Sequence, residues 1–463
     1  MKPRSTHVGL PLAALFLLLA FLPGGCRRVI VPKGEPIERK KAEEARAFFA
    51  MPIKKRPLPD LTTSASLSAV FVYAFNSNGE LEAAYREWLA AIERVPQAGA
   101  LPDPRLDFGY VFNPNDPKSF SLMFEQELPA RGKRPARAEL ALNLAQAAGE
   151  RFRAAKFRLQ RQVIHAYAGL ALNEALLAQT SETLRLLREA HEVATHRFHA
   201  MSEKGLGESL SDLRKVEVEI QTVESERRAL QIAHARQLAE LNSVLNRAPD
   251  AAIGTIEIPA IDAPARSDAE LFAQAVTLNP ELAALRKEIE ARGAAQVLAE
   301  LEKRPDYRIS GGIEDLSAAI SAGLTLPVSR AKIRAGIAEA LAMRQAAEAR
   351  LRAASSDVQA RVVIALAGLR DAERILSDYR DRIIPTTREL LQTQMTTYGS
   401  GGGDILDILD TERLLVDFRK LTLQAEADRL RFLAELEEVM GKDLFGLAQK
   451  SDPVRPVRQV RQV

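Results

Sequence analysis

Four segments of the chain alternate between apolar and polar residues. The first two are Leu106 to Phe112 and Ser119 to Leu128, and the other two lie between Tyr307 and Leu326. A period of two residues is typical of a β-strand with one apolar face and one polar face. The sequence therefore predicts two strand pairs, in residues 105–128 and 307–327.

A long helical pattern follows each strand pair, directly after Leu128-Pro129 and Leu326-Pro327. From Ala130 to about Glu203 the only proline is Pro135, close to the start, where a helix tolerates it. An apolar stripe of this length needs neighbours, so we predict helical hairpins over residues 130–248 and 328–441. Pro385 removes a backbone hydrogen bond in the second hairpin and predicts a kink near Ile384.

The same plan occurs twice, with a period near 200 residues. Asn78-Gly79-Glu80-Leu81 recurs as Asn279-Pro280-Glu281-Leu282, and Pro102-Asp103-Pro104-Arg105 recurs as Pro305-Asp306-Tyr307-Arg308. The period is much longer than that of solenoid repeats, so the pattern indicates a duplication. We assign residues 61–250 and 268–445 to the two repeats and residues 251–267 to a linker. Each repeat contains a helix, two strands and a long helical hairpin, which gives a mostly α fold with a small β part.

The amino terminus resembles an export signal. Lys2 and Arg4 precede an apolar run from Val8 to Leu22, which is too short for a membrane-spanning helix but suits a signal peptide. The run ends in Leu22-Pro23-Gly24-Gly25-Cys26, similar to a bacterial lipobox in which Cys26 is acylated, for example with palmitate. The alternative is an ordinary signal peptide cut near Gly25. We expect a signal peptide in residues 1–25, a lipid-anchored irregular leader in 26–60 and a disordered tail in 446–463.

Composition excludes several classes of function. Sixty-four Lys and Arg stand against 61 Asp and Glu, which argues against binding nucleic acid through bulk positive charge. A single cysteine excludes an intrachain disulfide and a cysteine-based zinc site. Gly132-Lys133-Arg134 lacks the rest of a phosphate-binding loop, and His196 and His199 have no obvious further ligand in the sequence. We expect no catalytic residues, no cofactor and no metal site.

The apolar strand faces allow two interpretations. In a soluble protein they would meet a core, and in an outer-membrane barrel they would meet lipid. Four strands are too few to close a barrel, and an open sheet edge cannot lie in lipid. The membrane interpretation therefore requires several copies of the chain, and three copies would supply 12 strands.

Several motifs together resemble the TolC-type outer membrane factors, of the branch found in heavy-metal and drug efflux systems. The resemblance rests on residues 97–105 (QAGALPDPR), on Gln126-Glu127-Leu128-Pro129 with Gly132-Lys133-Arg134, and on the turn from Tyr398 to Asp410. It implies a homotrimer with a 12-stranded β-barrel in the outer membrane, continued by a periplasmic α-helical barrel. It also implies a passive conduit, not an enzyme, that docks on a periplasmic adaptor (membrane fusion) protein and an inner-membrane pump.

The rival interpretation is a periplasmic coiled-coil adaptor or a structural lipoprotein. Such a chain would show one hairpin beside a compact β domain, whereas this sequence has two hairpins, each preceded by a strand pair. An envelope enzyme that processes glycans is disfavoured because no catalytic constellation is present.

The resemblance also points to site residues at the ends of the hairpins. Asp404, Asp407 and Asp410 recur every third residue, which places them along one side of a helix. With Tyr398, they correspond to a periplasmic gate in the family; the alternative is a solvated acidic face at a helix start. The expected adaptor contacts are the two turns: Gly205, Leu206, Gly207, Ser209 and Asp212 in the first, and Gly399, Ser400, Gly401, Gly402 and Gly403 in the second.

Overall fold

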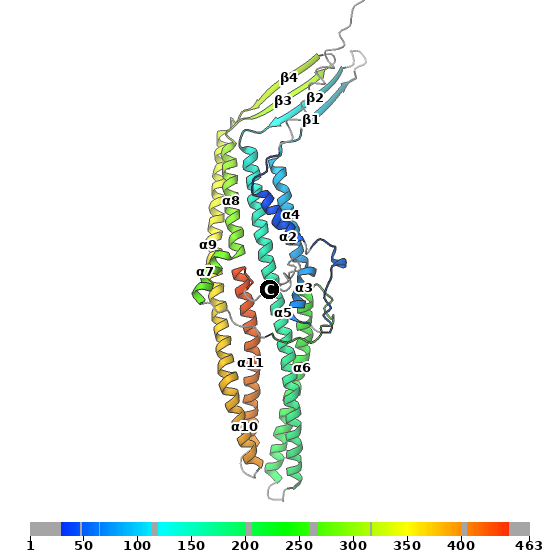
Figure 1. The fold of residues 1–463 in the computed structure, drawn as a ribbon, viewed down its shortest axis with the longest axis vertical. Helices are drawn as coiled ribbons and strands as arrows, with labels where there is room; N and C mark the ends of the chain where they lie inside the picture. The colour runs from blue at the N-terminus through cyan, green and yellow to red at the C-terminus, as the bar shows by residue number, and fades with distance from the viewer. Residues whose placement is uncertain are drawn as a thin grey trace, which may run out of the picture. The chain divides into compact units, whose positions relative to one another are not determined.

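The computed structural model describes residues 29–46, 49–63, 65–112, 119–200, 206–259, 267–314, 317–399 and 405–443 (Figure 1). These residues form two compact units. The first unit takes residues from 29–45, 83–152 and 281–355, and the second from 46–82, 153–280 and 356–443. Both repeats contribute to both units, because each repeat begins in the second unit, passes through the first and returns to the second. None of the helices in the described ranges combines the length and the apolar character needed to cross a membrane.

The first unit contains a four-stranded antiparallel sheet. Its strands are β1 (Arg105–Val111), β2 (Ser119–Leu128), β3 (Asp306–Glu314) and β4 (Ser317–Thr325), and they lie in chain order. The two predicted strand pairs are thereby confirmed. The pairing of β2 with β3, which sets Phe124 opposite Gly311, joins the two repeats in one sheet. β1 and β4 are the edges of this sheet and have no second partner strand among the described residues.

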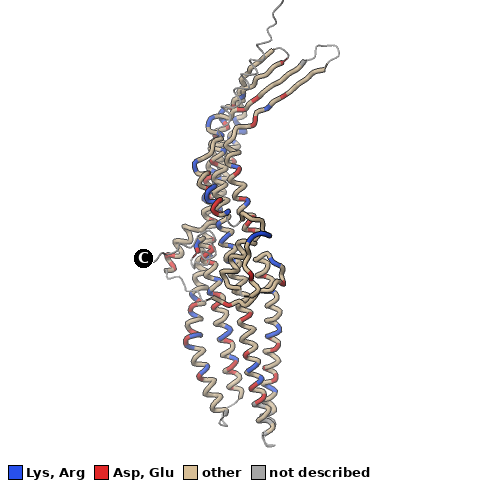
Figure 2. Tube along the Cα trace, turned by 45° about the vertical axis from the view of Figure 1, so that its right-hand side comes forward, with Lys and Arg blue, Asp and Glu red and all other residues tan. Residues whose placement is uncertain are grey.

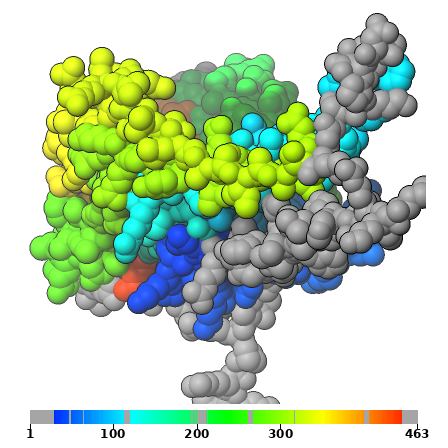
Figure 3. Space-filling view, turned by 90° about the horizontal axis from the view of Figure 1, so that it is seen from above, coloured from blue at the N-terminus to red at the C-terminus, as the bar shows by residue number. Residues whose placement is uncertain are grey.

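The apolar side of the sheet is open. The register places Phe108 beside Leu122 and Ile309 beside Ala322, so the apolar residues of all four strands share one face. Every residue of β4 is exposed, and Phe108 and Ile320 are 68% and 83% exposed. Figure 3 shows the yellow-green strands uncovered, and Figure 2 shows few charged residues along the strands compared with the helices. The described chain therefore supplies no core for this face.

Helices of the first unit pack around an aromatic cluster. Trp88 of α4 (Gly79–Gly99) stacks on Phe152 at 5.5 Å between ring centroids, and Tyr85 meets both rings edge-on. The Trp88 indole N–H donates to the carboxylate of Glu38 at 3.0 Å. Glu38 belongs to α2 (Glu35–Ala45), so the leader predicted to be irregular contains an 11-residue helix. The sequence pattern misled because α2 is mostly charged, and it is held by this contact and not by an apolar stripe.

Hydrogen bonds fix the leader and the start of the first long helix. The N–H of Ile30 donates to the carbonyl of Gly99 at 3.2 Å, which brings the leader beside the chain that enters β1. Lys133, which is 1% exposed, donates to Asp306 at 2.9 Å and to Glu302 at 3.0 Å. The N–H of Ala130 also donates to Asp306, at 2.7 Å. Lys133 is thus a buried structural anchor between the two repeats.

The second unit contains the free ends of two helical hairpins, whose ascending helices begin in the first unit. The first hairpin consists of α5 (Lys133–Ala200) and α6 (Leu206–Val244). The second consists of α9 (Arg330–Ile375), a π-helix η3 (Leu376–Ile383), α10 (Ile384–Gly399) and α11 (Ile405–Met440). These helices lie within the ranges predicted for the two hairpins, 130–248 and 328–441. Residues 251–259 of the predicted linker contain no helix and one isolated bridge residue, and residues 260–266 lie outside the described part.

Two short helices that were not predicted from the sequence come before the helices that lead to the strands. Helix α3 (Leu67–Ser77) comes before α4, and α7 (Asp268–Leu278) comes before α8 (Pro280–Leu301). A short 3-10 helix, η2 (Ile53–Lys55), lies in the leader. Each of α3 and α7 has 11 residues and a serine N-cap, so the duplication extends to these helices.

Candidate functional site

The predicted adaptor contacts lie where the hairpins turn. Helix α5 ends at Ala200 and α6 begins at Leu206, while α10 ends at Gly399 and α11 begins at Ile405. Leu206, Gly207, Ser209 and Asp212 belong to the first turns of α6. Gly205, Asp404 and the run of Ser400, Gly401, Gly402 and Gly403 fall in the gaps between these helices, outside the described residues, as does Cys26.

An apolar cluster holds the two hairpins together close to these turns. Its buried members come from α5, α6 and α11: Leu184, Leu187, Val216, Val223, Ile405, Ile408 and Leu409. Tyr398, at the end of α10, packs against this cluster and is partly buried. The predicted gate residue Tyr398 therefore has a packing role in the described structure.

The two described gate aspartates lie on the outside of this cluster. Ile408 and Leu409 are buried, whereas Asp407 and Asp410 are exposed, because a helix alternates its faces over three to four residues. Both carboxylates lie in the first turns of α11, where the helix dipole favours negative charge. Asp407 and Asp410 share the exposed side of α11.

Asp410 is connected to the neighbouring hairpin through an arginine. Arg413 forms an ion pair with Asp410 at 3.3 Å and a second ion pair with Glu219 of α6. Seven residues further along α11, Lys420 pairs with Glu226 of α6 at 2.6 Å. Sequence reading missed this ladder of ion pairs, because each partner lies 194 residues away and nothing local marks the pairing.

The π-helix η3 sits in the helix that leads to the second turn. The N–H of Ile384 donates to the carbonyl of Tyr379, five residues back, and Pro385 follows. Thr386 and Thr387 donate their hydroxyls to the carbonyls of Arg382 and Ile383, at 3.0 and 2.8 Å. The wider turn accommodates the proline, which has no N–H and would crowd the preceding turn of an α-helix. The sequence predicted a kink near Ile384, and the structure has a π-helix directly before this position.

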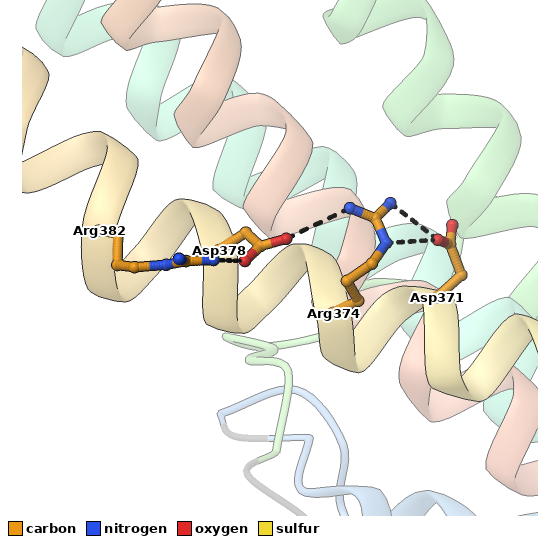
Figure 4. A network of polar contacts seen from close by, with 4 residues as sticks. All are labelled: Asp371, Arg374, Asp378 and Arg382. Atoms are coloured by element: carbon orange, nitrogen blue, oxygen red, sulfur yellow. Dashed lines mark hydrogen bonds and ion pairs between the residues drawn. The ribbon is translucent and has the colours of Figure 1, made fainter.

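Charged side chains line the outer surface of this π-helix. Arg374 donates to Asp371 at 2.8 Å and to Asp378 at 3.4 Å, and Arg382 pairs with the other oxygen of Asp378 (Figure 4). On another side Arg380 pairs with Glu426 of α11, and Tyr379 meets Phe418 at 5.3 Å between ring centroids. Residues within the π-helix therefore contact α11.

The described residues contain no group of three or more His, Cys, Asp or Glu arranged to hold a metal ion. His191 lies 3.7 Å from Glu217 of α6, and His196 is exposed. Lys133, which belongs to the partial phosphate-loop motif, forms ion pairs with Glu302 and Asp306.

Comparison with known proteins gives structural matches only. No protein-family model and no protein of curated function matches the chain. Among solved structures, CusC matches with a TM-score of 0.70 at 18% identity, over 85% of this chain and 97% of that chain. VceC of Vibrio cholerae matches with a TM-score of 0.66 at 20% identity, over 82% and 96%. MtrE of Neisseria gonorrhoeae matches with a TM-score of 0.69 at 17% identity, over 82% and 89%.

The chain has the fold of outer-membrane channel proteins. MtrE is described as an outer membrane channel and VceC as an outer membrane protein, and the study of CusC concerns transmembrane channel formation. The matched region covers 82–85% of this chain and 89–97% of these chains. The resemblance stated from sequence is confirmed at the level of the fold.

Proposed function

We propose that this protein is the outer-membrane channel of a tripartite efflux system, and that it acts as a passive conduit. The observation that carries the proposal is the four-stranded sheet, whose apolar face is not covered and whose two edges are not paired by any described residue. The channel fold of the structural neighbours supports it. The alternative of a periplasmic adaptor or structural lipoprotein does not account for this sheet.

Lipid is the occupant that best suits the apolar face. Leu106, Phe108, Ile320 and Leu324 are all at least half exposed in the single chain. Removing one such side chain from water contributes roughly 1.5–3 kcal/mol, so leaving the whole face in water is costly. The opposite face carries Arg308 beside Glu125 and Glu127, a polar surface suited to a water-filled lumen.

Closure between copies would satisfy both edges. In hydrocarbon, unpaired strand groups cost several kcal/mol each, so β4 of one copy must pair with β1 of the next. Three copies give 12 strands, within the range of outer-membrane barrels. The homotrimer and the 12-stranded barrel continued by a periplasmic helical barrel are part of this proposal.

The duplication predicts the register of that pairing. Pro129 and Pro327 are 198 positions apart, and Asp103 and Asp306 are 203 positions apart. Shifting the observed Glu125–Ser310 pair of β2 and β3 by these offsets gives Gly323 of β4 opposite Asp107 of β1 in the next copy. The same shift sets Asp103 near the start of α9, as Asp306 lies at the start of α5.

The test is a cysteine cross-link at this predicted pair. Chains carrying both Asp107→Cys and Gly323→Cys, oxidised in outer membranes, should give covalent dimers and trimers and no larger species. Directly opposite residues have Cβ atoms about 4.5–5.5 Å apart, within reach of a disulfide after small shifts. The two single variants are controls for Cys26, and Asp107→Cys with Leu324→Cys places the second thiol on the other face.

Two results would contradict the proposal. A monomer that stays in water without detergent would favour the adaptor or lipoprotein alternative. A cross-linked ladder that extends past three copies would reject the trimer.

The remaining parts of the proposal follow the resemblance. Cys26 is the lipid attachment site that holds the protein at the outer membrane. Asp404, Asp407, Asp410 and Tyr398 form the periplasmic gate, and the hairpin turns dock a periplasmic adaptor that connects to an inner-membrane pump. The ion pairs of Arg413 with Asp410 and Glu219 support a gate that is coupled to the neighbouring hairpin.

A further inference from the structure

A cavity of about 240 Å³ lies between the two hairpins, beside the apolar cluster defined above. Its walls come from α5, α6 and α11, the helices labelled side by side in Figure 1. Binding pockets for drug-sized ligands have volumes of roughly 300–1,000 Å³, so this cavity suits a smaller molecule. It is lined by residues of one chain within the second unit, so it exists whether or not copies assemble.

One partly buried carboxylate that lines this cavity, Glu412 of α11, has no ion-pair partner among the described residues. Burial raises its pKa, the positive charge of Arg419 opposes this, and the negative charge of Glu219 adds to it. Among the other carboxylates of the lining, Glu219 is paired with Arg413 and Glu226 with Lys420, and Asp417 is exposed. Glu412 therefore lies in a partly desolvated place where Arg419 acts on it without forming an ion pair.

A buried hydroxyl in the same wall is also without a partner. Thr180 of α5 is only 2% exposed, and its Oγ1 makes no hydrogen bond. Its neighbour Thr183 donates to the carbonyl of Gln179 at 3.1 Å, and Thr222 donates to Val218 at 2.9 Å, as threonines in helices commonly do. A buried polar group without a partner destabilises the folded chain, and a ligand that hydrogen-bonds this hydroxyl would remove that cost.

Apolar side chains complete the cavity. Leu187, Val223 and Leu409 are nearly fully buried, and Val416 lies beside them. The lining thus combines an unpaired carboxylate, an unpartnered hydroxyl and a hydrocarbon wall, and its two cations, Arg413 and Lys420, are paired with Glu219 and Glu226. That set is complementary to a small molecule with one cationic hydrogen-bond donor and one apolar part.

The geometry points to a binding site for a small organic ammonium ion, whose charge lies against Glu412 and the Thr180 hydroxyl and whose hydrocarbon part packs on Leu187, Val223 and Val416. A metal ion does not fit, because the described residues offer no cluster of three metal-binding side chains. Water alone would satisfy Thr180 but would leave the charge of Glu412 unpaired. The site lies where the hairpins meet, so an occupant would stabilise their contact.

The experiment measures ligand-induced thermal stabilisation of the full chain in detergent at mildly alkaline pH, which favours the ionised form of Glu412. The probe is benzylammonium, and the matched neutral control is benzyl alcohol, which has the same ring and nearly the same size. Benzylammonium should raise the melting temperature in a saturable way, because a ligand that binds only the folded state stabilises it. Benzyl alcohol at equal concentration should give a much smaller shift.

Two isosteric variants locate the site. Glu412→Gln removes the charge and should weaken the apparent affinity for benzylammonium by about tenfold or more, as expected for loss of a charge-assisted hydrogen bond. Thr180→Val removes the hydroxyl and should weaken it less. Glu192→Gln is the control, since Glu192 is an exposed carboxylate of α5 outside the cavity.

Two outcomes would overturn the inference: equal shifts with benzylammonium and benzyl alcohol, or an unchanged benzylammonium affinity in Glu412→Gln. Should a variant not fold, saturation-transfer NMR of benzylammonium on the unmodified chain, with and without excess ethylammonium as competitor, decides the question. Absence of both transfer and competition would reject the site. These results do not depend on channel activity or assembly.

Discussion

Asn78 and Asn279 make the same hydrogen bond in the two repeats. The side-chain amide of Asn78 donates to the carbonyl of Val244 at 3.2 Å, and that of Asn279 donates to the carbonyl of Val439 at 2.7 Å. Each asparagine also ends a short helix, α3 or α7, by donating its N–H to an alanine carbonyl. Each bond holds the end of a descending helix, α6 or α11, just before a residue with positive φ, Asn246 or Gly441.

The difference between the two asparagines predicts unequal costs of removal. Asn279 is 1% exposed, and Asn279→Ala would leave a buried carbonyl unsatisfied, so we expect a loss of about 1–3 kcal/mol in the free energy of unfolding. Asn78 is more exposed, but its side chain also caps α4 by accepting from the N–H of Leu81 at 2.9 Å. Asn78→Ala should cost about 1 kcal/mol.

Denaturant unfolding of the detergent-solubilised protein checks this order. Gln97→Ala is a suitable control, because Gln97 makes an exposed bond within its own helix. A larger loss of unfolding free energy for Asn78→Ala than for Asn279→Ala would contradict the prediction that the buried asparagine contributes more.

Pro385→Ala tests what produces the π-helix. Alanine restores an N–H donor and removes the crowding of the preceding turn, and proline in a helix interior costs about 3 kcal/mol relative to alanine. If the proline alone imposes the wide turn, the variant should be more stable, and amides near Ile384 should exchange more slowly by hydrogen-exchange mass spectrometry. Thr393→Ala, whose hydroxyl bonds Glu389 at 2.9 Å on the same helix, is the control.

The opposite result has a different cause. Unchanged or reduced stability of Pro385→Ala would mean that contacts of the segment with α11 set its geometry, namely Arg380 with Glu426 and Tyr379 with Phe418.

The proposed gate gives a prediction for ion conduction. The double change Asp407→Asn with Asp410→Asn should raise single-channel conductance and lower cation selectivity in planar bilayers, because it removes negative charge from the entrance. Unchanged conductance and selectivity would leave only the alternative of a solvated acidic face.

Arg413→Gln separates charge from coupling at that gate. It keeps both aspartates but breaks the ion pairs with Asp410 and Glu219, so conductance should rise while cation selectivity is retained. Lys420→Gln breaks the next pair along α11 and serves as the matched control. An equal effect of Arg413→Gln and Lys420→Gln on conductance would show that the ion pair at Asp410 has no special role.

His165 predicts a pH dependence of stability. Burial, with repulsion from Arg161 and Arg431, lowers its pKa from 6.5 to about 4. The unfolded chain therefore binds more protons than the folded chain between these values, so stability should fall as the pH drops from about 6.5 to about 4. His165→Gln should flatten the melting temperature over this window, whereas His196→Gln, at an exposed position, should not. A slope that survives His165→Gln would assign the effect to other groups.

The elements with a clear period could be predicted from the sequence. Alternation marked the four strands, and long runs free of proline marked both hairpins, because their side chains face one environment along the whole element. Helix α2 was missed, since its few tertiary contacts, such as Glu38 with Trp88, leave no periodic pattern. The Arg413–Glu219 pair and the cavity at Glu412 depend on which helices become neighbours, and that is not encoded in local spacing.

The hydrogen bond between Ile30 and Gly99 limits the distance between a lipid anchor at Cys26 and the sheet. Ile30 is four positions after Cys26, and a fully extended chain spans at most about 3.6 Å per residue. The proposed acylation site is therefore at most about 14 Å from Ile30, whose partner Gly99 is six positions before β1. Acyl chains on Cys26, as proposed, would enter the bilayer next to the strands, and this short connection would limit the depth of the proposed barrel in the membrane.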